Sequence, residues 1–166
     1  FLENVYAFLD ARRPLGTELY VIGCEYVPLG ISVGVTLAEG AGRESVLTAV
    51  RDGLRRFLWP LEGGGVLGSG WPLGENVRER ELAAAVARVT GVTSVPSLKL
   101  FRRVDDEWQR IQPVADNAQL TLERWQLPEL LSVVAAADSE APDTLAGGLG
   151  AASSGVAVPV VVDVCR

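Results

Sequence analysis

The sequence predicts an α+β domain of two layers, with about three helices packed on a mainly antiparallel sheet. Three observations indicate this fold class. Apolar residues recur at helical spacing in three segments, an alternating segment follows the first of them, and strand-like segments follow the last. The strand–helix–strand order in between resembles a split β-α-β element, whose strand order the pattern leaves open.

The first helix is expected in residues 1–13, FLENVYAFLDARR. One helical face carries its apolar residues, at spacings of one, three and four: Phe1, Leu2, Val5, Phe8 and Leu9. Pro14 and Gly16 end the helix. An apolar face of this kind is buried most easily against a sheet, and we expect all the helices to pack there.

Two strands are expected next, in residues 18–26 and 27–38. The second has apolar residues at every other position, a period typical of a half-buried strand: Val27, Leu29, Ile31, Val33, Val35 and Leu37. The residues between them are small or polar, which would let a neighbouring element approach closely. Cys24, in the first strand, is interpreted as a buried thiol.

A second amphipathic helix is expected between Gly42 and Pro60. Its apolar stripe is formed by Val46, Leu47, Val50, Leu54, Phe57 and Leu58. The Gly-rich stretch that follows, residues 61–76, is predicted to be a hairpin or an ordered loop.

A third helix is expected to begin near Asn76. The side chain of Asn76 would cap this helix, while Glu79 reaches back to complete a capping box. After the helix, residues 92–111 predict a strand, a turn at 105–106 and a return strand. Pro96 favours an edge position or a bulge early in the first of these strands.

The predicted domain covers residues 1–134, with one more short strand near 120–122. Residues 135–155 are rich in Ala, Gly and Ser, and this composition predicts a flexible linker. The last segment, 156–166, is expected to be an isolated strand or a tail that docks on a neighbour.

Charge and hydropathy exclude two classes of partner. The net charge is −6, from 15 basic and 21 acidic residues. We therefore expect no nucleic acid partner, because affinity for phosphate backbones comes mainly from clustered Lys and Arg. No apolar run is long enough for membrane insertion, and no signal peptide is recognisable, so synthesis in the cytoplasm is expected. The absence of Met and the start inside an apolar pattern predict a fragment of a longer polypeptide.

Residue types that support catalysis or metal binding are sparse. The chain has no His, and Lys99 is its single lysine. The acidic run 105–107 is interpreted as a solvated turn, and the Gly-rich loop lacks the ending of a phosphate-binding loop. Cys24 and Cys165 are isolated from each other in the sequence and make no disulfide framework or zinc site. We predict no catalytic residue, no cofactor, no metal and no enzyme activity.

A doubled Trp-Pro-Leu motif flanks the Gly-rich stretch, at residues 59–61 and 71–73. In one interpretation the two tryptophans hold an otherwise floppy loop on the domain, because each ring buries a large area at little entropic cost. In the other, the loop protrudes and its aromatic residues bind a partner protein. The predicted interface residues are Trp59, Trp71, Pro72, Leu73 and Trp125.

Several unusual motifs occur in one order in this chain. A helix ends in Leu-x-Pro-Leu at 58–61, and a Gly-rich stretch, Gly-Trp-Pro-Leu-Gly at 70–74, a helix and Gly-Val at 91–92 follow. With the run 5–37 and the ending VPVVVDVC, these motifs resemble the C-terminal part of baseplate J-like proteins. Those proteins are wedge subunits of contractile phage tails and of extracellular contractile injection systems. The resemblance covers residues 1–134 and the tail, and the family's large N-terminal portion is missing.

The resemblance implies a structural role in a baseplate. Expected partners are other wedge subunits, through self-pairing or pairing with a related J-like subunit, together with sheath-initiating or hub proteins. The implied location is the bacterial cytoplasm during synthesis, and afterwards a phage-tail-like particle that can leave the cell.

Two alternative functions stay open. Split β-α-β domains often bind ligands at helix–strand loops, so a small-molecule-binding regulatory module is the second hypothesis. The third is a cysteine-dependent enzyme that uses Cys24, which requires an accessible and reactive thiol.

Overall fold

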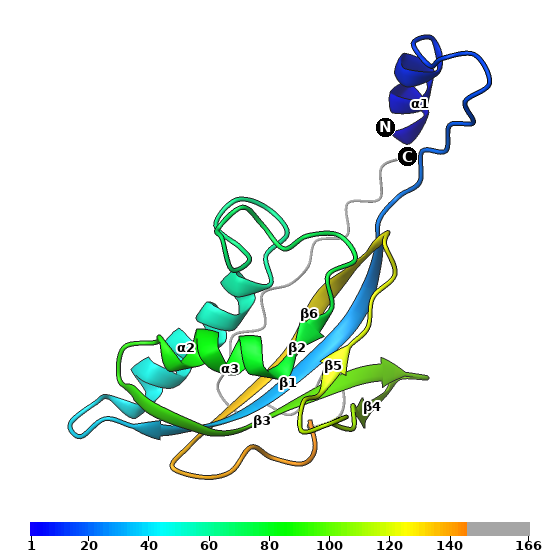
Figure 1. The fold of residues 1–166 in the computed structure, drawn as a ribbon. Helices are drawn as coiled ribbons and strands as arrows, with labels where there is room; N and C mark the ends of the chain where they lie inside the picture. The colour runs from blue at the N-terminus through cyan, green and yellow to red at the C-terminus, as the bar shows by residue number, and fades with distance from the viewer. Residues whose placement is uncertain (146–166) are drawn as a thin grey trace.

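The structure, a computed structural model, describes residues 1–145 of the 166-residue chain (Figure 1). The remaining part of the predicted linker and the predicted tail lie outside the described residues. The elements occur in the order α1 (Leu2–Asp10), β1 (Glu25–Leu37), α2 (Arg43–Phe57), β2 (Val77–Arg78), α3 (Glu79–Ala87), β3 (Val92–Val104), β4 (Glu107–Arg110), β5 (Gln119–Leu120) and β6 (Gln126–Ala137).

The main sheet has four strands in the order β4-β3-β1-β6, and β2 and β5 form a small second sheet. β1 pairs antiparallel with β3 and parallel with β6, and β3 pairs antiparallel with β4. The predicted α+β class with a mainly antiparallel sheet is therefore confirmed. The predicted split β-α-β element takes a different form, because the strands on either side of α2 and α3 are adjacent and antiparallel.

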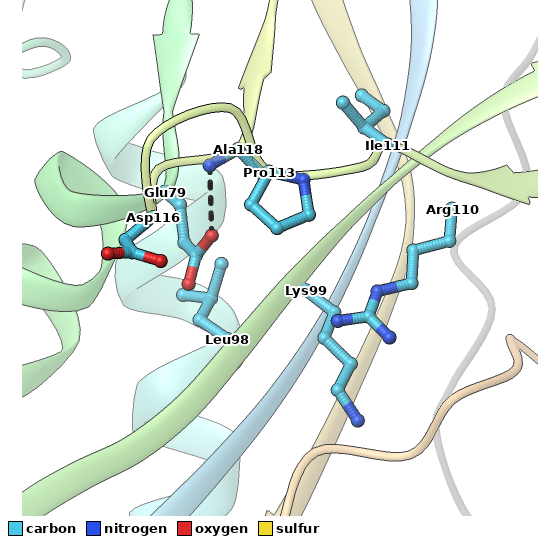
Figure 2. Close-up of a pocket in the computed structure, with 8 residues that line it drawn as sticks. All are labelled: Glu79, Leu98, Lys99, Arg110, Ile111, Pro113, Asp116 and Ala118. Carbon is cyan, nitrogen blue, oxygen red and sulfur yellow. Dashed lines mark hydrogen bonds between the residues drawn. The ribbon is translucent and has the colours of Figure 1, made fainter.

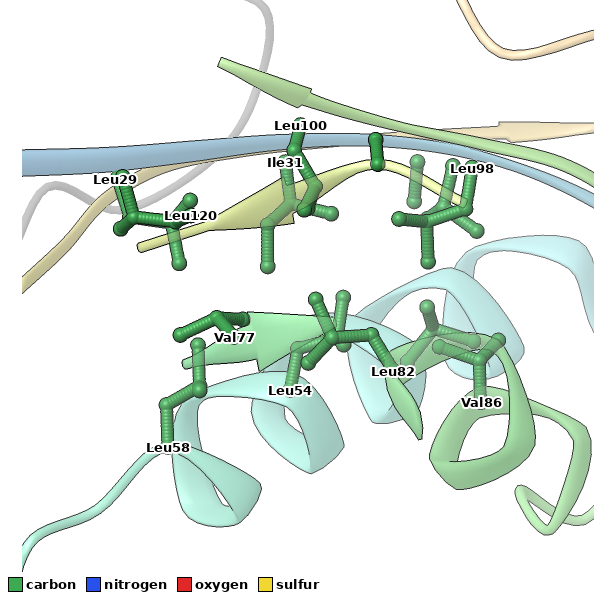
Figure 3. Packing of buried hydrophobic residues seen from close by; sticks show 14 of the residues in the cluster. Leu29, Ile31, Leu54, Leu58, Val77, Leu82, Val86, Leu98, Leu100 and Leu120 are labelled. Carbon is green, nitrogen blue, oxygen red and sulfur yellow. The ribbon is translucent and has the colours of Figure 1, made fainter. Parts of the chain in front are cut away.

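The main core lies between one face of the sheet and the helices α2 and α3. Figure 3 shows Ile31, Leu98 and Leu100 from the sheet on one side of this layer, and Leu54 and Leu82 from the helices on the other. Most of these side chains are fully buried. Burying a Leu or Ile side chain stabilises a fold by about 1.5–3 kcal/mol, so this layer is the main source of stability.

β1 differs from the expected half-buried strand, because both of its faces are buried from Leu29 to Val35. It is one of the two inner strands, and residues 138–145 with Trp108 cover the face opposite the helices. The predicted close approach over its small residues is confirmed: a Cβ at Gly30 would overlap Leu145 and lie 3.0 Å from the Trp108 ring. The expected separate strand at 18–26 is wrong, since β1 begins only at Glu25.

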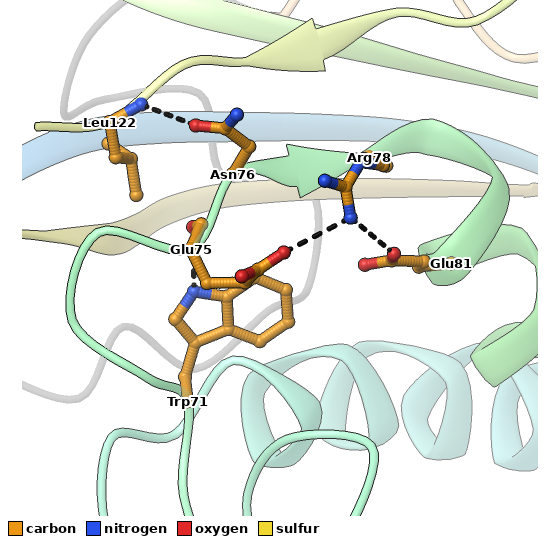
Figure 4. A network of polar contacts seen from close by, with 6 residues as sticks. All are labelled: Trp71, Glu75, Asn76, Arg78, Glu81 and Leu122. Carbon is orange, nitrogen blue, oxygen red and sulfur yellow. Dashed lines mark hydrogen bonds and ion pairs between the residues drawn. The ribbon is translucent and has the colours of Figure 1, made fainter.

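The start of α3 also differs from the prediction. Its N-cap residue is Arg78, whose side chain makes no capping hydrogen bond, so the expected capping box is wrong. The Asn76 side chain instead accepts a hydrogen bond from the Leu122 amide at 2.9 Å (Figure 4). Glu79 accepts one from the Ala118 amide at 3.1 Å. Both side chains thus tie the β4–β6 connection to the start of α3, where β5 pairs with β2.

The β3–β4 hairpin follows the prediction closely. Asp105 and Asp106 have φ angles of 48° and 67°, and positive φ at both central residues is typical of a tight hairpin turn. Pro96 lies where the β1–β3 register shifts, between the pairs made by Ser94 and Ser97. The expected bulge is therefore confirmed.

The sheet extends beyond the predicted domain end at residue 134. β6 continues to Ala137, and Ala135 and Ala137 belong to the buried core. Ala141 and Leu145 are buried as well. Residues 135–145 are therefore part of the fold, because alanines fit where the sheet is closely covered and do not act here as linker residues.

α1 forms where the first helix was expected, but none of its residues is buried. In Figure 1 it lies apart from the sheet, at the end of an extended connection that leads into β1. The expectation that this helix packs on the sheet is wrong. Among residues 1–145, the structure contains no helix of the length and apolarity needed to cross a bilayer.

Candidate protein-contact surface

Trp71 is a core residue and not a surface contact, which corrects the predicted interface set. Its side chain is only 3% exposed and contacts Phe57 edge-to-face, with ring centroids 5.6 Å apart. The indole Nε1 donates to the carbonyl oxygen of Glu75 at 3.2 Å (Figure 4). The burial of Trp71 supports the first interpretation, in which this ring holds the Gly-rich loop on the domain.

The Gly-rich loop is ordered by its own backbone hydrogen bonds. The Trp71 amide donates to the Trp59 carbonyl at 2.8 Å, and the Gly65 amide donates to the Phe57 carbonyl at 2.7 Å. At Gly65 and Gly70 the φ angles are 70° and 100°, and an added Cβ would meet backbone atoms. Only glycine combines this conformation with such close contact, so the predicted ordered loop is confirmed.

The outer part of this loop carries exposed apolar side chains. We call Trp59, Leu61, Val66 and Leu67 the loop tip; Trp59 is 52% exposed and Leu67 is 90% exposed. The two motifs therefore end up in different environments, with Trp59 at the surface and Trp71 inside. A rigid loop with exposed apolar side chains can bind a partner without much loss of conformational entropy.

A second apolar surface lies beside the loop, where three segments meet. They enclose a hollow of about 350 Å³ lined by Ile22, Gly23, Cys24, Leu73, Arg124 and Trp125. We call it the apolar hollow. It brings together two of the predicted interface residues, Leu73 and Trp125. Pro72 is exposed beside Leu73 but, like Trp59, does not line the hollow.

Hydrogen bonds hold the three segments of the apolar hollow in place. The Glu25 amide donates to the Trp125 carbonyl at 3.1 Å, and the Trp125 indole donates to the Glu25 carboxylate at 3.2 Å. The Gly74 amide donates to the Gln126 carbonyl at 3.0 Å. The hollow is thus built from fixed backbone at the start of β1 and β6, and not from loose side chains.

Four of the residues that line the hollow are missing from the predicted set: Ile22, Gly23, Cys24 and Arg124. The first three were assigned to a strand, and Cys24 was expected to be buried, but it is exposed. The signal that could have found them is the continuous apolar run 19–22, which does not alternate as a half-buried strand would.

A polar network supports the turn between the loop and α3. Arg78 donates to the carboxylates of Glu75 and Glu81 at 3.1 and 2.9 Å (Figure 4). The hydrogen bond that Arg78 donates to Glu81 is the main reason why the pKa of Arg78 is raised above its ordinary value. Because Glu75 also accepts from Trp71 through its backbone, this network links the clamp to the helix start.

A smaller, polar hollow of about 220 Å³ lies at the edge of the sheet (Figure 2). Lys99 and Arg110 lie on one side, and Glu79 and Asp116 on the other. Small-molecule sites usually enclose about 300–1,000 Å³, so this one is small. Its Glu79 carboxylate is already engaged by the Ala118 amide.

The other candidate chemistries find little support among residues 1–145. In this range no group of three or more His, Cys, Asp or Glu side chains could hold a metal ion. The acidic run 105–107 is an exposed turn and hairpin strand, as expected. Among residues 1–145, the one hydrogen-bond partner of the Cys24 thiol is the carbonyl oxygen of its neighbour Glu25, at 3.6 Å.

Comparison with known proteins leaves the family of this chain open, since no family model matches it and no curated protein is found as a relative. Its function is therefore inferred from its surface and its motifs.

Proposed function

We propose that this chain belongs to a structural subunit that works by binding other proteins, and that the subunit is a baseplate wedge of a contractile, phage-tail-like particle. The observation that carries the proposal is the apolar hollow, which groups exposed large side chains on a rigid frame. Grouped apolar surface of this kind marks protein contacts, whereas single exposed apolar residues are ordinary.

The chemistry of the apolar hollow fits one anchoring side chain from a partner. Its lining is mainly apolar and includes Trp125 beside the charged Arg124. A partner Phe, Leu or Tyr that enters it would be shielded from water on several sides. Buried aromatic and apolar anchors supply most of the affinity in protein interfaces.

The loop tip and the N-terminal arm, residues 1–24, extend the same kind of surface. Leu67 on the loop tip and Tyr20 and Ile22 on the arm are all exposed. A subunit that joins several neighbours needs more than one contact surface, and these features supply three. The ordered set of motifs shared with baseplate J-like proteins supports the specific role, with other wedge subunits as partners.

The role is tested by electron microscopy of particles from a producer strain that lacks the full-length gene. We expect complete sheathed particles to disappear, leaving free tubes or disordered sheath. Normal contractile particles in this strain would contradict a structural role.

The contact surface is tested by complementing that strain with the full-length gene carrying Leu73→Glu. A carboxylate in the apolar hollow should reduce complete particles at least about tenfold, since the charge would lose its hydration when a partner covers it. The matched control is Val114→Glu, at another exposed apolar residue, in the β4–β5 connection, which should assemble normally. Equal assembly by both variants would remove the apolar hollow from the proposal.

The polar hollow favours one second candidate, a module that binds a small charged molecule. Lys99, Arg110, Glu79 and Asp116 line it with both charges, although Lys99 and Arg110 also bind the Asp143 carboxylate. A thermal-shift screen of metabolites tests it, because a ligand that binds the native state raises the melting temperature. No shift with any metabolite at millimolar concentration would reject this candidate.

A further inference from the structure

The second face of the main sheet is covered by residues 138–145, which we call the strap. The strap follows β6 and crosses the face that points away from α2 and α3 (Figure 1, orange). At its start, Asp138 has a φ of 55°, and its amide donates to the Val35 carbonyl at 2.8 Å. Its carboxylate accepts from the Leu37 amide at 3.2 Å. The strap is thus fixed at one end but forms no strand.

The sheet is shaped to receive the strap. At Gly34 an added Cβ would overlap the Ser139 carbonyl oxygen and lie 2.8 Å from the Ala141 amide nitrogen. At Gly30 it would overlap the Leu145 side chain. Glycine at these two positions of the central strand therefore opens a groove, in which Ala141 and Leu145 are buried. The strap passes from Gly34 toward Gly30, antiparallel to β1.

Two cations on the sheet recognise the middle of the strap. The Lys99 ammonium donates to the Ala141 carbonyl at 2.5 Å and to the Asp143 carboxylate at 2.9 Å. Arg110 donates to the same carboxylate at 3.1 Å. In Figure 2 the two side chains lie next to each other, and Lys99 extends toward the strap. The Ala141 amide completes the set by donating to the Ser97 hydroxyl at 2.7 Å.

These contacts are specific for a short sequence pattern in the peptide that lies in the groove. The backbone of residues 139–141 crosses over Gly34, where Ala141 is buried; an Asp two residues later reaches Lys99 and Arg110, and a Leu two residues further fits over Gly30. The chain bends at Asp143 and Thr144, so a bent peptide and not a strand presents these side chains. The groove is thus complementary to a small-x-Asp-x-Leu peptide.

We propose that this face is a peptide-binding groove, that the strap is its resident occupant, and that an acidic partner peptide of the small-x-Asp-x-Leu pattern replaces it. The groove residues belong to paired strands. The strap is held differently: it belongs to neither sheet and makes no ladder pairing.

The charge on Lys99 explains why the replacement must be acidic. Its side chain is 11% exposed, and all of its hydrogen-bond partners among the described residues lie on the strap. A departing strap would take away these hydrogen-bond partners, and an acidic peptide restores them. Ser32, paired with Lys99 in the sheet, is fully buried and its hydroxyl has no partner among residues 1–145. The resident occupant therefore leaves one polar group that another peptide can satisfy.

The test uses the full chain and a fluorescently labelled peptide with the sequence of residues 139–145, followed by fluorescence anisotropy. We expect the double variant Asp143→Asn, Leu145→Ala to bind the peptide at least about tenfold more tightly than the wild-type chain. The tethered strap competes with the peptide at an effective concentration on the order of millimolar, and the variant weakens that competitor. Adding Lys99→Ala to the double variant should abolish this gain.

The matched control is the same peptide with Asn in place of its Asp, which should bind the double variant at least about tenfold more weakly. If the double variant keeps the circular dichroism of the wild-type chain and does not bind the acidic peptide, the proposal is overturned. A second measurement covers a variant that fails to fold. Several millimolar unlabelled peptide should accelerate hydrogen exchange at the Ala141 amide of the wild-type chain, and unchanged protection there would also overturn the proposal.

Discussion

At the scale of residues, the two tryptophans of the doubled motif have different roles, although each begins the same Trp-Pro-Leu sequence. Trp71 is enclosed by Phe57 and by its bond to the Glu75 carbonyl, whereas Trp59 is half exposed on the loop tip. The two residues are joined by a backbone hydrogen bond, from the Trp71 amide to the Trp59 carbonyl, and yet only the Trp71 ring is buried.

This difference predicts opposite behaviour in a matched pair of variants. Trp71→Ala should lower the free energy of unfolding by about 3–5 kcal/mol, because it removes a buried aromatic ring and leaves a cavity. Trp59→Ala should cost about 1 kcal/mol or less, as an exposed side chain does. Urea unfolding of both variants checks the prediction, and equal losses would show that the clamp interpretation of Trp71 is wrong.

At the scale of elements, the strap should respond to pH through Asp143. The hydrogen bond from Lys99, followed by its charge, lowers the pKa of Asp143 below the ordinary value of 3.8. A carboxylate whose folded pKa is depressed contributes stability above the unfolded pKa, and that contribution is lost as pH falls through the folded pKa. Arg110 is the other charged group that faces this carboxylate among the described contacts.

We therefore expect the strap to loosen only at strongly acidic pH. The amide resonance of Ala141 should shift with a midpoint below 3.8, and Asp143→Asn should remove that transition. Glu140→Gln is the control on the same strap, since Glu140 has no ion pair among the described residues and its loss should leave the transition in place. A midpoint above 3.8 would contradict the pairing with Lys99.

At the scale of the whole molecule, local sequence patterns predicted which segments form helices and strands. They did not predict equally well what those elements pack against. The stripe of α2, the β3–β4 turn at Asp105–Asp106 and the bulge at Pro96 follow from spacing and turn chemistry, and each is confirmed. The burial of β1 on both faces depends on the strap, which comes more than 100 residues later. No pattern in β1 alone distinguishes a solvated face from one covered by a distant segment.

In the candidate site, too, some features follow from local sequence and others depend on distant segments. Trp125 and Leu73 were found because large apolar residues in loops often form contacts, but the packing of Trp71 and the role of Ile22 depend on tertiary structure. Asn76 and Glu79 have the right spacing for a capping box, yet their side chains bind the amides of Leu122 and Ala118. These distant amides compete with the local helix amides, and the competition is decided only when β5 pairs with β2.

The arm formed by α1 and its connection gives the last prediction, which concerns the division between folding and binding. Because α1 buries none of its residues, deleting residues 1–13 should change the free energy of unfolding by no more than about 0.5 kcal/mol. The same deletion in the full-length gene should nevertheless reduce particle assembly, since it removes the exposed apolar face of α1. Thermal unfolding and electron microscopy check the two halves separately. A large loss of stability would mean that α1 serves the fold of this domain, and normal assembly would mean that its apolar face binds no partner needed in the particle.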